Sequence, residues 1–317
     1  MKFYLTVAII LFQVFTSPAQ KISLVPKIKV HQFAMPVRDI SVITMSGDTS
    51  YLGMIQKGLL NNKKMVVPDK PLRAFFQDYI TSQYKAQYTP GGKSLLYIIK
   101  YLRIGERSGN VRENAFVCLK ADVYVSEDQQ QYQLACSVDT LMKWAGMDVT
   151  HAHNRNIEEA IDLIAITADN QIADATKQTK ESILNKLHEW FAQPAFVLKA
   201  FRQGVYLTYD DFLHNNPQTN GTMQKDGRNL VMLDSLNHPI SNFWGFSYQG
   251  VFYKKVRNTF IPFIRYGRNF EMVATEIDLD PVMSFGTELQ LIAEESPFGP
   301  LQPYATGIDL YNGELTL

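Results

Sequence analysis

The sequence predicts an α+β fold in which an antiparallel meander packs on helices, followed by a β-rich domain shaped as a curled sheet or a partly open barrel. Three observations lead to this prediction. Apolar and polar residues alternate with a period of two over 115–125 and 132–138, which is typical of strands, and the apolar run 95–104 is a further strand candidate before them. Apolar stripes with a helical period lie before and after that stretch. Beyond residue 194 the helical pattern fades, and turn residues recur about every 8–12 residues.

The composition narrows the class of protein. The chain has 317 residues, 31 basic and 31 acidic, and 46% of its residues are hydrophobic, which excludes a disordered chain. A net charge of zero argues against a nucleic-acid binder, because such proteins carry a basic excess. Two cysteines exclude a disulfide framework and a multi-cysteine metal site, and no pattern points to a cofactor.

Residues 1–19 have the features of a secretory signal peptide. Lys2 precedes an apolar run over 5–15, and Ser17-Pro18-Ala19 places small residues before a cut at Gln20. A transmembrane helix needs roughly 20 apolar residues, so the run is too short to remain as an anchor. The residue after the cut is not cysteine, so the protein is not expected to be a lipoprotein. We expect a periplasmic, envelope-associated or secreted protein with no transmembrane span after cleavage.

The first domain, 20–195, is expected to hold the meander and its helices. Asp69 and Pro71 form a typical helix start, and the apolar residues after them follow one helical stripe. Asn156 followed by Glu159 resembles a capping box at the start of a second helix. The elements expected in this domain are strands at 40–45, 51–55, 95–104, 115–125 and 132–142, and helices from 71, from 156 and over 177–191.

The same alternation makes a prediction about the two cysteines. Cys118 falls among the polar residues of its strand, whereas Cys136 falls on the apolar face of the next strand. If both apolar faces share one core, Cys118 points outward and Cys136 points inward. Their Cβ vectors then diverge, which a disulfide does not tolerate, so we expect two free thiols.

The second domain, 196–317, is expected to be rich in strands. Pro194 ends the preceding helix, because the residue before a proline disfavours the helical region. Gln249-Gly250 separates two apolar runs, as in a tight hairpin. The stretch 213–241 holds many polar residues and is expected to be an exposed excursion. The expected strands are 204–208, 230–233, 244–248, 251–256, 259–266, 269–275, 288–293 and 304–310.

Two blocks of this domain resemble a recurrent segment. Residues 204–217, Gly-Val-Tyr followed by an acidic-Phe turn and Asn-Asn-Pro, resemble a segment of an uncharacterised family of exported Bacteroidota proteins. In that family Trp-Gly-[Phe/Tyr] and Gly-x-x-[Phe/Tyr] strands follow, and residues 243–246 and 250–253 match them. The family has no assigned catalytic residues, so the resemblance implies export and no site. The element order over 38–191 also resembles the α/β accessory domains of bacterial envelope proteins.

Few residues indicate catalysis or metal binding. His151 and His153 are the one close histidine pair and are weak candidates for a metal site, because no third ligand stands at a recognisable spacing. The acidic pair Asp210-Asp211 fits a helix cap better than a catalytic pair. No nucleophile elbow, zinc-protease motif, P-loop or dinucleotide fingerprint occurs. The sequence therefore indicates no catalytic residue.

Aromatic residues are dense early in the second domain. Strand aromatics are usually core, but alternation leaves some on an outer face, and Trp and Tyr are enriched at binding surfaces. We expect a contact surface for an envelope protein or a glycan, formed by Tyr206, Tyr209, Trp244, Phe246, Tyr248 and Tyr253. The leading hypothesis is a non-catalytic interaction or accessory module. The alternative is a hydrolase acting on envelope or extracellular material, with a site between the two domains where the histidines and an acid converge.

Overall fold

The computed structural model describes most of the chain from Gln20 onward. The described residues are 20–25, 27, 32–45, 51–57, 62–108, 112–147, 149, 151–170, 176–226, 229–256, 259–272 and 303–317. The proposed signal peptide at 1–19, the expected strand at 288–293 and residues 273–275 of another expected strand lie outside them. Within the described residues, no helix has both the length and the apolar character needed to cross a membrane.

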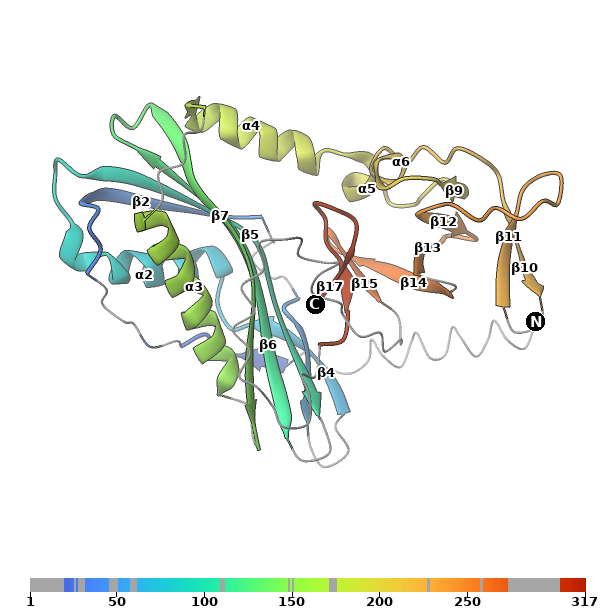
Figure 1. The fold of residues 1–317 in the computed structure, drawn as a ribbon, viewed down its shortest axis with the longest axis horizontal. Coiled ribbons are helices and arrows are strands. Elements are labelled where there is room, and N and C mark those ends of the chain that lie inside the picture. Colours follow the sequence, from blue (N-terminus) through green and yellow to red (C-terminus); the bar gives the residue numbers. More distant parts are fainter. Residues whose placement is uncertain are drawn as a thin grey trace. The chain divides into compact units, whose positions relative to one another are not determined.

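The chain forms two compact units (Figure 1). Unit 1 extends to Ile183, and unit 2 begins at Leu184 and includes residues 305–316. The division falls inside α4 (Lys180–Phe191), earlier in the chain than the boundary after residue 195 that the sequence suggested.

Unit 1 is built on an eight-stranded sheet. Its central meander, β5 (Lys93–Ser108), β6 (Glu113–Ser126) and β7 (Gln131–Gly146), is antiparallel, as predicted. The strand order is β1-β4-β3-β5-β6-β7-β8, and β2 also pairs with β5. The outer strands are β1 (Gln20–Ile22), β2 (Val37–Thr44), β3 (Gly53–Lys57), β4 (Asn62–Pro68) and β8 (Gln178–Thr179). The sheet is mixed, because β1 pairs with β4, and β2 and β3 pair with β5, in parallel.

Two helices cover one face of this sheet. The stripe of α2 (Leu72–Gln83) is buried as predicted, and α3 (Ala152–Asn170) packs on β6 and β7. A short 3₁₀ helix, η1 (Lys85–Gln87), follows α2.

Both predicted helix starts are wrong. Pro71 is the N-cap of α2, and the Asp69 carboxylate instead accepts a bond from Leu24 N–H, 3.2 Å. α3 begins before Asn156, whose buried amide donates to the Ala115 carbonyl, 3.1 Å.

The central strands are buried on both faces. Cys136 lies in the helix-covered core and directly opposite Val123. Cys118 lies on the other face, but the expectation that it points to solvent is wrong, because its exposed fraction is 0%. Charged residues on that face form ion pairs, which offset the cost of burying them: Lys120 lies 2.7 Å from Asp139. Both thiols are free, as predicted, and burial raises the pKa of Cys136 to about 12.

Unit 2 is built on a seven-stranded antiparallel sheet in the order β17-β16-β15-β14-β13-β12-β9. Gln249 and Gly250 have φ of 50° and 79° and join β12 to β13 in the predicted tight turn. The expected excursion at 213–241 contains a second hairpin, β10–β11, so it is not simply a loop. The strands are β9 (Gly204–Tyr206), β10 (Thr222–Asp226), β11 (Asn229–Leu233), β12 (Gly245–Tyr248), β13 (Val251–Val256), β14 (Thr259–Tyr266), β15 (Asn269–Met272), β16 (Gly307–Ile308) and β17 (Leu315–Thr316), and the helices are α5 (Pro194–Val197) and α6 (Tyr209–Leu213).

Each face of the unit 2 sheet carries its own aromatic cluster. On the α6 face, Phe212 of α6 packs on Phe252 and Phe270, with ring centroids 4.6 and 5.2 Å apart. On the hairpin face, Phe246 stacks on Tyr253 at 4.8 Å, and Met232 of β11 joins the same cluster. The sheet is therefore a layer between α6 and the β10–β11 hairpin.

Candidate functional site

A shallow hollow of about 460 Å³ opens on the surface of unit 2. Its volume falls within the range of small-molecule sites, about 300–1,000 Å³. The residues that line it come from the end of β9, from the segment before β12 and from β13. They are Leu207, Ser241, Asn242, Phe243, Trp244 and Lys255.

Backbone hydrogen bonds hold the walls of this hollow together. Trp244 N–H donates to the carbonyls of Tyr206 and Leu207, at 3.0 and 3.1 Å. Lys255 N–H donates to the Trp244 carbonyl at 3.0 Å, so the segment is fixed to strands on both sides. The Lys255 ammonium bonds to the Ser241 carbonyl and lies 4.9 Å from the Phe243 ring centre. The hollow thus combines apolar ring surface with a positioned positive charge.

Several contacts hold the side chain of Trp244 in place. Its indole N–H donates to the Gly313 carbonyl at 3.1 Å, and its ring lies 4.7 Å from Phe212. The ammonium of Lys254 lies over the same ring at 4.5 Å. A ring held in this way loses little side-chain freedom when a ligand binds, which favours recognition.

Lys254 is a buried lysine with a lowered pKa. Its side chain is 5% exposed, and the nearest acid oxygen, Glu314 Oε2, is 4.0 Å away. Burial lowers the pKa of Lys254 to about 8, and the Glu314 carboxylate raises it only in part. It points to the α6 face, whereas its neighbour Lys255 points to the hollow.

The six aromatic residues expected to form a contact surface lie on two opposite faces of the sheet. Tyr206 and Phe246 are buried, and the other four are half-buried. Only Trp244 of the six lines the hollow. Tyr209 contacts Trp244 on the α6 face, where burial raises its pKa, and its hydroxyl donates to the Leu310 carbonyl, 2.6 Å. Tyr248 and Tyr253 pack on the hairpin face.

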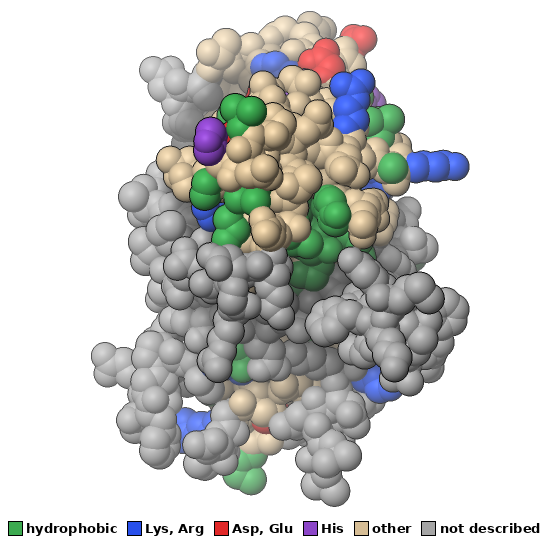
Figure 2. Space-filling view, turned by 90° about the vertical axis from the view of Figure 1, so that its right-hand side faces the viewer, with side chains coloured by type: hydrophobic (Ala, Val, Ile, Leu, Met, Phe, Trp, Pro, Cys, Tyr) green, Lys and Arg blue, Asp and Glu red, His purple; other side chains and the backbone are tan. Residues whose placement is uncertain are grey.

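The rest of the hollow was missed by sequence reasoning. Ser241 and Asn242 lie outside the strands and carry no pattern, and Leu207, which was expected inside the strand 204–208, lies just after the end of β9. Phe243 stands beside the Trp-Gly-Phe block, which was the one available signal. On the face of the molecule in Figure 2, hydrophobic side chains form several small groups among polar ones.

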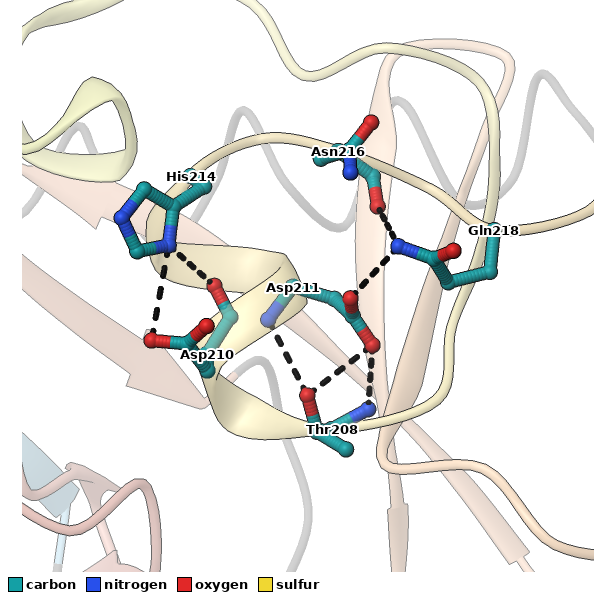
Figure 3. A network of polar contacts seen from close by, with 6 residues as sticks. All are labelled: Thr208, Asp210, Asp211, His214, Asn216 and Gln218. Atoms are coloured by element: carbon teal, nitrogen blue, oxygen red, sulfur yellow. Dashed lines mark hydrogen bonds and ion pairs between the residues drawn. The ribbon is translucent and has the colours of Figure 1, made fainter.

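The acidic pair before Phe212 serves the local fold (Figure 3). Thr208 is the N-cap of α6, and Thr208 and Asp211 form a reciprocal capping box. Asp211 also accepts a bond from the Gln218 amide at 2.6 Å, which ties the following loop to the helix. Asp210 pairs with His214 at 3.4 Å on the surface. The expectation that this acidic pair caps a short turn is confirmed for Asp211.

The two candidate metal-binding histidines lie in different environments. His153 is buried, and its Nε2 lies 2.7 Å from Glu106 Oε1. The other oxygen of that carboxylate, Glu106 Oε2, accepts from Gln56 N–H at 2.6 Å. His151, in contrast to His153, is exposed. No group of three or more His, Cys, Asp or Glu side chains that could hold a metal occurs among the described residues.

Comparisons with known proteins give little help. No family model and no curated protein matches the chain. Two solved structures are weakly similar. Protein XCC0632 from Xanthomonas campestris, of family DUF330, has a TM-score of 0.31 and 12% identity over 47% of this chain and 95% of that one. An uncharacterised protein has a TM-score of 0.29 and 6% identity over 47% and 99% of the two chains. Similarity at this level carries no argument about function, and the fold class stands on the structure itself, which is α+β and rich in strands.

Proposed function

We propose that the protein is an exported, non-catalytic interaction module that binds an envelope protein or a glycan through the hollow of unit 2. The observation that carries the proposal is the set of walls around that hollow. Leu207 is 44% exposed, Asn242 is exposed, and Trp244 lines the hollow beside them.

The chemistry of the walls indicates the kind of ligand. An indole and a phenyl ring offer flat apolar surface to a sugar ring or to an extended peptide. The Asn242 side chain offers both donors and an acceptor, and the Lys255 ammonium offers donors alone. Export of the protein is supported by the apolar run and small residues of 1–19.

The experiment is affinity capture from the native cell envelope with a matched pair of variants. Leu207→Asp places a charge in the hollow and should reduce capture of the ligand by about tenfold or more. Leu236→Asp is the control, because Leu236 is also an exposed leucine of unit 2, 72% exposed, and does not line the hollow. Both variants should unfold at the temperature of the wild type.

Two outcomes would contradict the proposal. Equal capture by the wild type and by Leu207→Asp would remove the hollow from the binding site. Loss of capture by Leu236→Asp alone would place the site elsewhere on unit 2. Enzymatic removal of glycans before capture separates a glycan ligand from a protein ligand.

A further inference from the structure

The hollow of unit 2 carries a single charged side chain. Among the six described residues that line it, Lys255 is the one lysine, and none is an arginine, an aspartate or a glutamate. The Lys255 ammonium bonds to the Ser241 carbonyl and lies 4.9 Å from the Phe243 ring centre, and both of these partners are neutral. No ion pair joins Lys255 to an acid within the described part of the chain. Its positive charge therefore has no direct counter-charge there.

Lysines that the fold partly buries in unit 1 are treated differently. Lys100 lies 2.6 Å from Asp122, and Lys120 lies 2.7 Å from Asp139. Such pairing offsets the cost of taking an ammonium out of water. Lys255 is half-buried as well, but its neighbours are a carbonyl and an aromatic ring. The contrast indicates that an anion from outside the chain completes the pair in the hollow.

The charge of the hollow selects the kind of anion. A single ammonium matches a carboxylate, which carries one negative charge and accepts hydrogen bonds on both oxygens. A phosphate group carries about 1.5 to 2 negative charges near neutral pH, and planar arginine forks are the side chains best suited to it. Because the described lining holds no arginine and no second lysine, a carboxylate is the better match.

The size of the hollow selects the kind of molecule. A protein partner covers roughly 20–30 residues on each side of a stable interface. Six residues around about 460 Å³ are instead the scale of a small-ligand site. The exposed amide of Asn242 offers two donors and an acceptor, a set that suits neighbouring sugar hydroxyls, and Leu207 adds exposed apolar surface. These walls suit a sugar residue better than the face of a protein.

We infer that the hollow recognises a carboxylate-bearing sugar residue of an acidic envelope polysaccharide. The Lys255 ammonium donates to the carboxylate, and the Asn242 amide bonds to hydroxyls of the same sugar. The inference rests on the proposed function and deepens it, because it names the class of ligand and the residue that selects it.

The test compares one polysaccharide with and without its negative charges. Polysaccharide from the host envelope is freed of protein with protease and divided into two samples, one of which is methyl-esterified at its carboxylates. Esterification removes the charge and leaves the sugar hydroxyls in place. The purified full chain should bind the native sample about tenfold more tightly than the esterified one, measured by biolayer interferometry.

Three variants assign this preference to one side chain. Lys255→Gln removes the charge and should bind both samples with the same, roughly tenfold weaker affinity. Lys255→Arg keeps the charge and should keep most of the preference. Lys199→Gln is the control for net charge, because Lys199 is an exposed lysine of unit 2 that does not line the hollow. Thermal unfolding of each variant shows whether the fold is intact.

Three outcomes would overturn the inference. Equal affinity of the wild type for the two samples would remove the carboxylate from recognition. A preference that survives in Lys255→Gln would place the anion site elsewhere. No binding to the native polysaccharide, while capture of an envelope protein stays sensitive to Leu207→Asp, would make the ligand a protein and leave the proposed function standing.

Discussion

The two sheets of the molecule bury their side chains in different ways. The unit 1 sheet has long strands whose helix-covered core is mostly aliphatic, and charged residues on its other face are neutralised in pairs. The unit 2 sheet has short strands with aromatic clusters on both faces. Short strands supply few ladder bonds, so unit 2 depends on a small number of large rings and on side chains that bond to loop carbonyls.

This difference explains why the candidate site lies in unit 2. Connecting segments there are fixed by rings and by single hydrogen bonds, and a hollow opens beside them. In unit 1 the comparable segments pack along helices: Ala34 and Met35 donate to the Asp169 carboxylate at 2.8 Å. The prediction is that unit 2 is sensitive to single ring deletions and to the charge on Lys254, whereas unit 1 is not affected by either change.

The largest effect is expected from Phe212→Ala. Phe212 is fully buried and contacts Trp244, Phe252 and Phe270, so its loss should cost about 3–5 kcal/mol of the stability of unit 2. Variants that keep only Trp244 or only Trp144 of the three tryptophans report by fluorescence on the urea unfolding of unit 2 and of unit 1 separately. An equal loss of unfolding free energy in both units would contradict the separation of the two cores.

The pH dependence of unit 2 gives the next effect. The pKa of Lys254 is lowered from its usual value to about 8, so above pH 8 the unfolded chain binds more protons than the folded one. Stability should therefore rise by about 1–2 kcal/mol between pH 8 and 9.5. Lys254→Met should remove the rise. Above about pH 10, Tyr206 and Tyr209, whose pKa values are raised, act in the opposite direction.

A rise of the same size in Lys254→Met would assign the pH dependence to another group. Lys255→Met is the matched control, because Lys255 is half-buried on the opposite face and should leave the rise in place.

The smallest effect is expected from the capping box. Asp211→Ala removes the acceptor of Thr208 N–H and of the Gln218 amide, and it should cost about 1 kcal/mol. Asp210→Ala should change stability by less than about 0.5 kcal/mol, because its ion pair with His214 is exposed. The urea midpoints of the two variants measure these losses of stability. A larger loss for Asp210→Ala than for Asp211→Ala would contradict the role of Asp211 as the capping residue.

Sequence reasoning found the elements whose signal is periodic. The β5–β7 meander, the α2 stripe and the Gln249-Gly250 turn follow from local pattern alone. It failed where a distant partner decides. The Asp69 carboxylate accepts from Leu24 N–H and does not cap a helix, and the Asn156 amide donates to the Ala115 carbonyl and does not cap one either. Both partners are distant in the sequence, so the local pattern does not reveal them.

The candidate site was predicted in part for the same reason. Aromatic density pointed to the stretch of chain that includes Trp244, which lines the hollow. Strand alternation alone does not say that both faces of the unit 2 sheet are covered, so the buried Tyr206 and Phe246 were expected at a surface. Leu207 and Asn242 are far apart in the sequence, and the bonds of Trp244 N–H to the carbonyls of Tyr206 and Leu207 help to bring their segments together.

The most direct test of the binding proposal is photo-cross-linking in the living host. A photoreactive amino acid at Asn242, which is exposed and lines the hollow, should form a covalent adduct with an envelope component. The same group at Leu236, exposed on unit 2 outside the hollow, should not. An adduct specific to position 242 and lost with Leu207→Asp is the predicted result. Adducts of equal yield at both positions, or none at 242, would contradict the proposal that the hollow is the binding site.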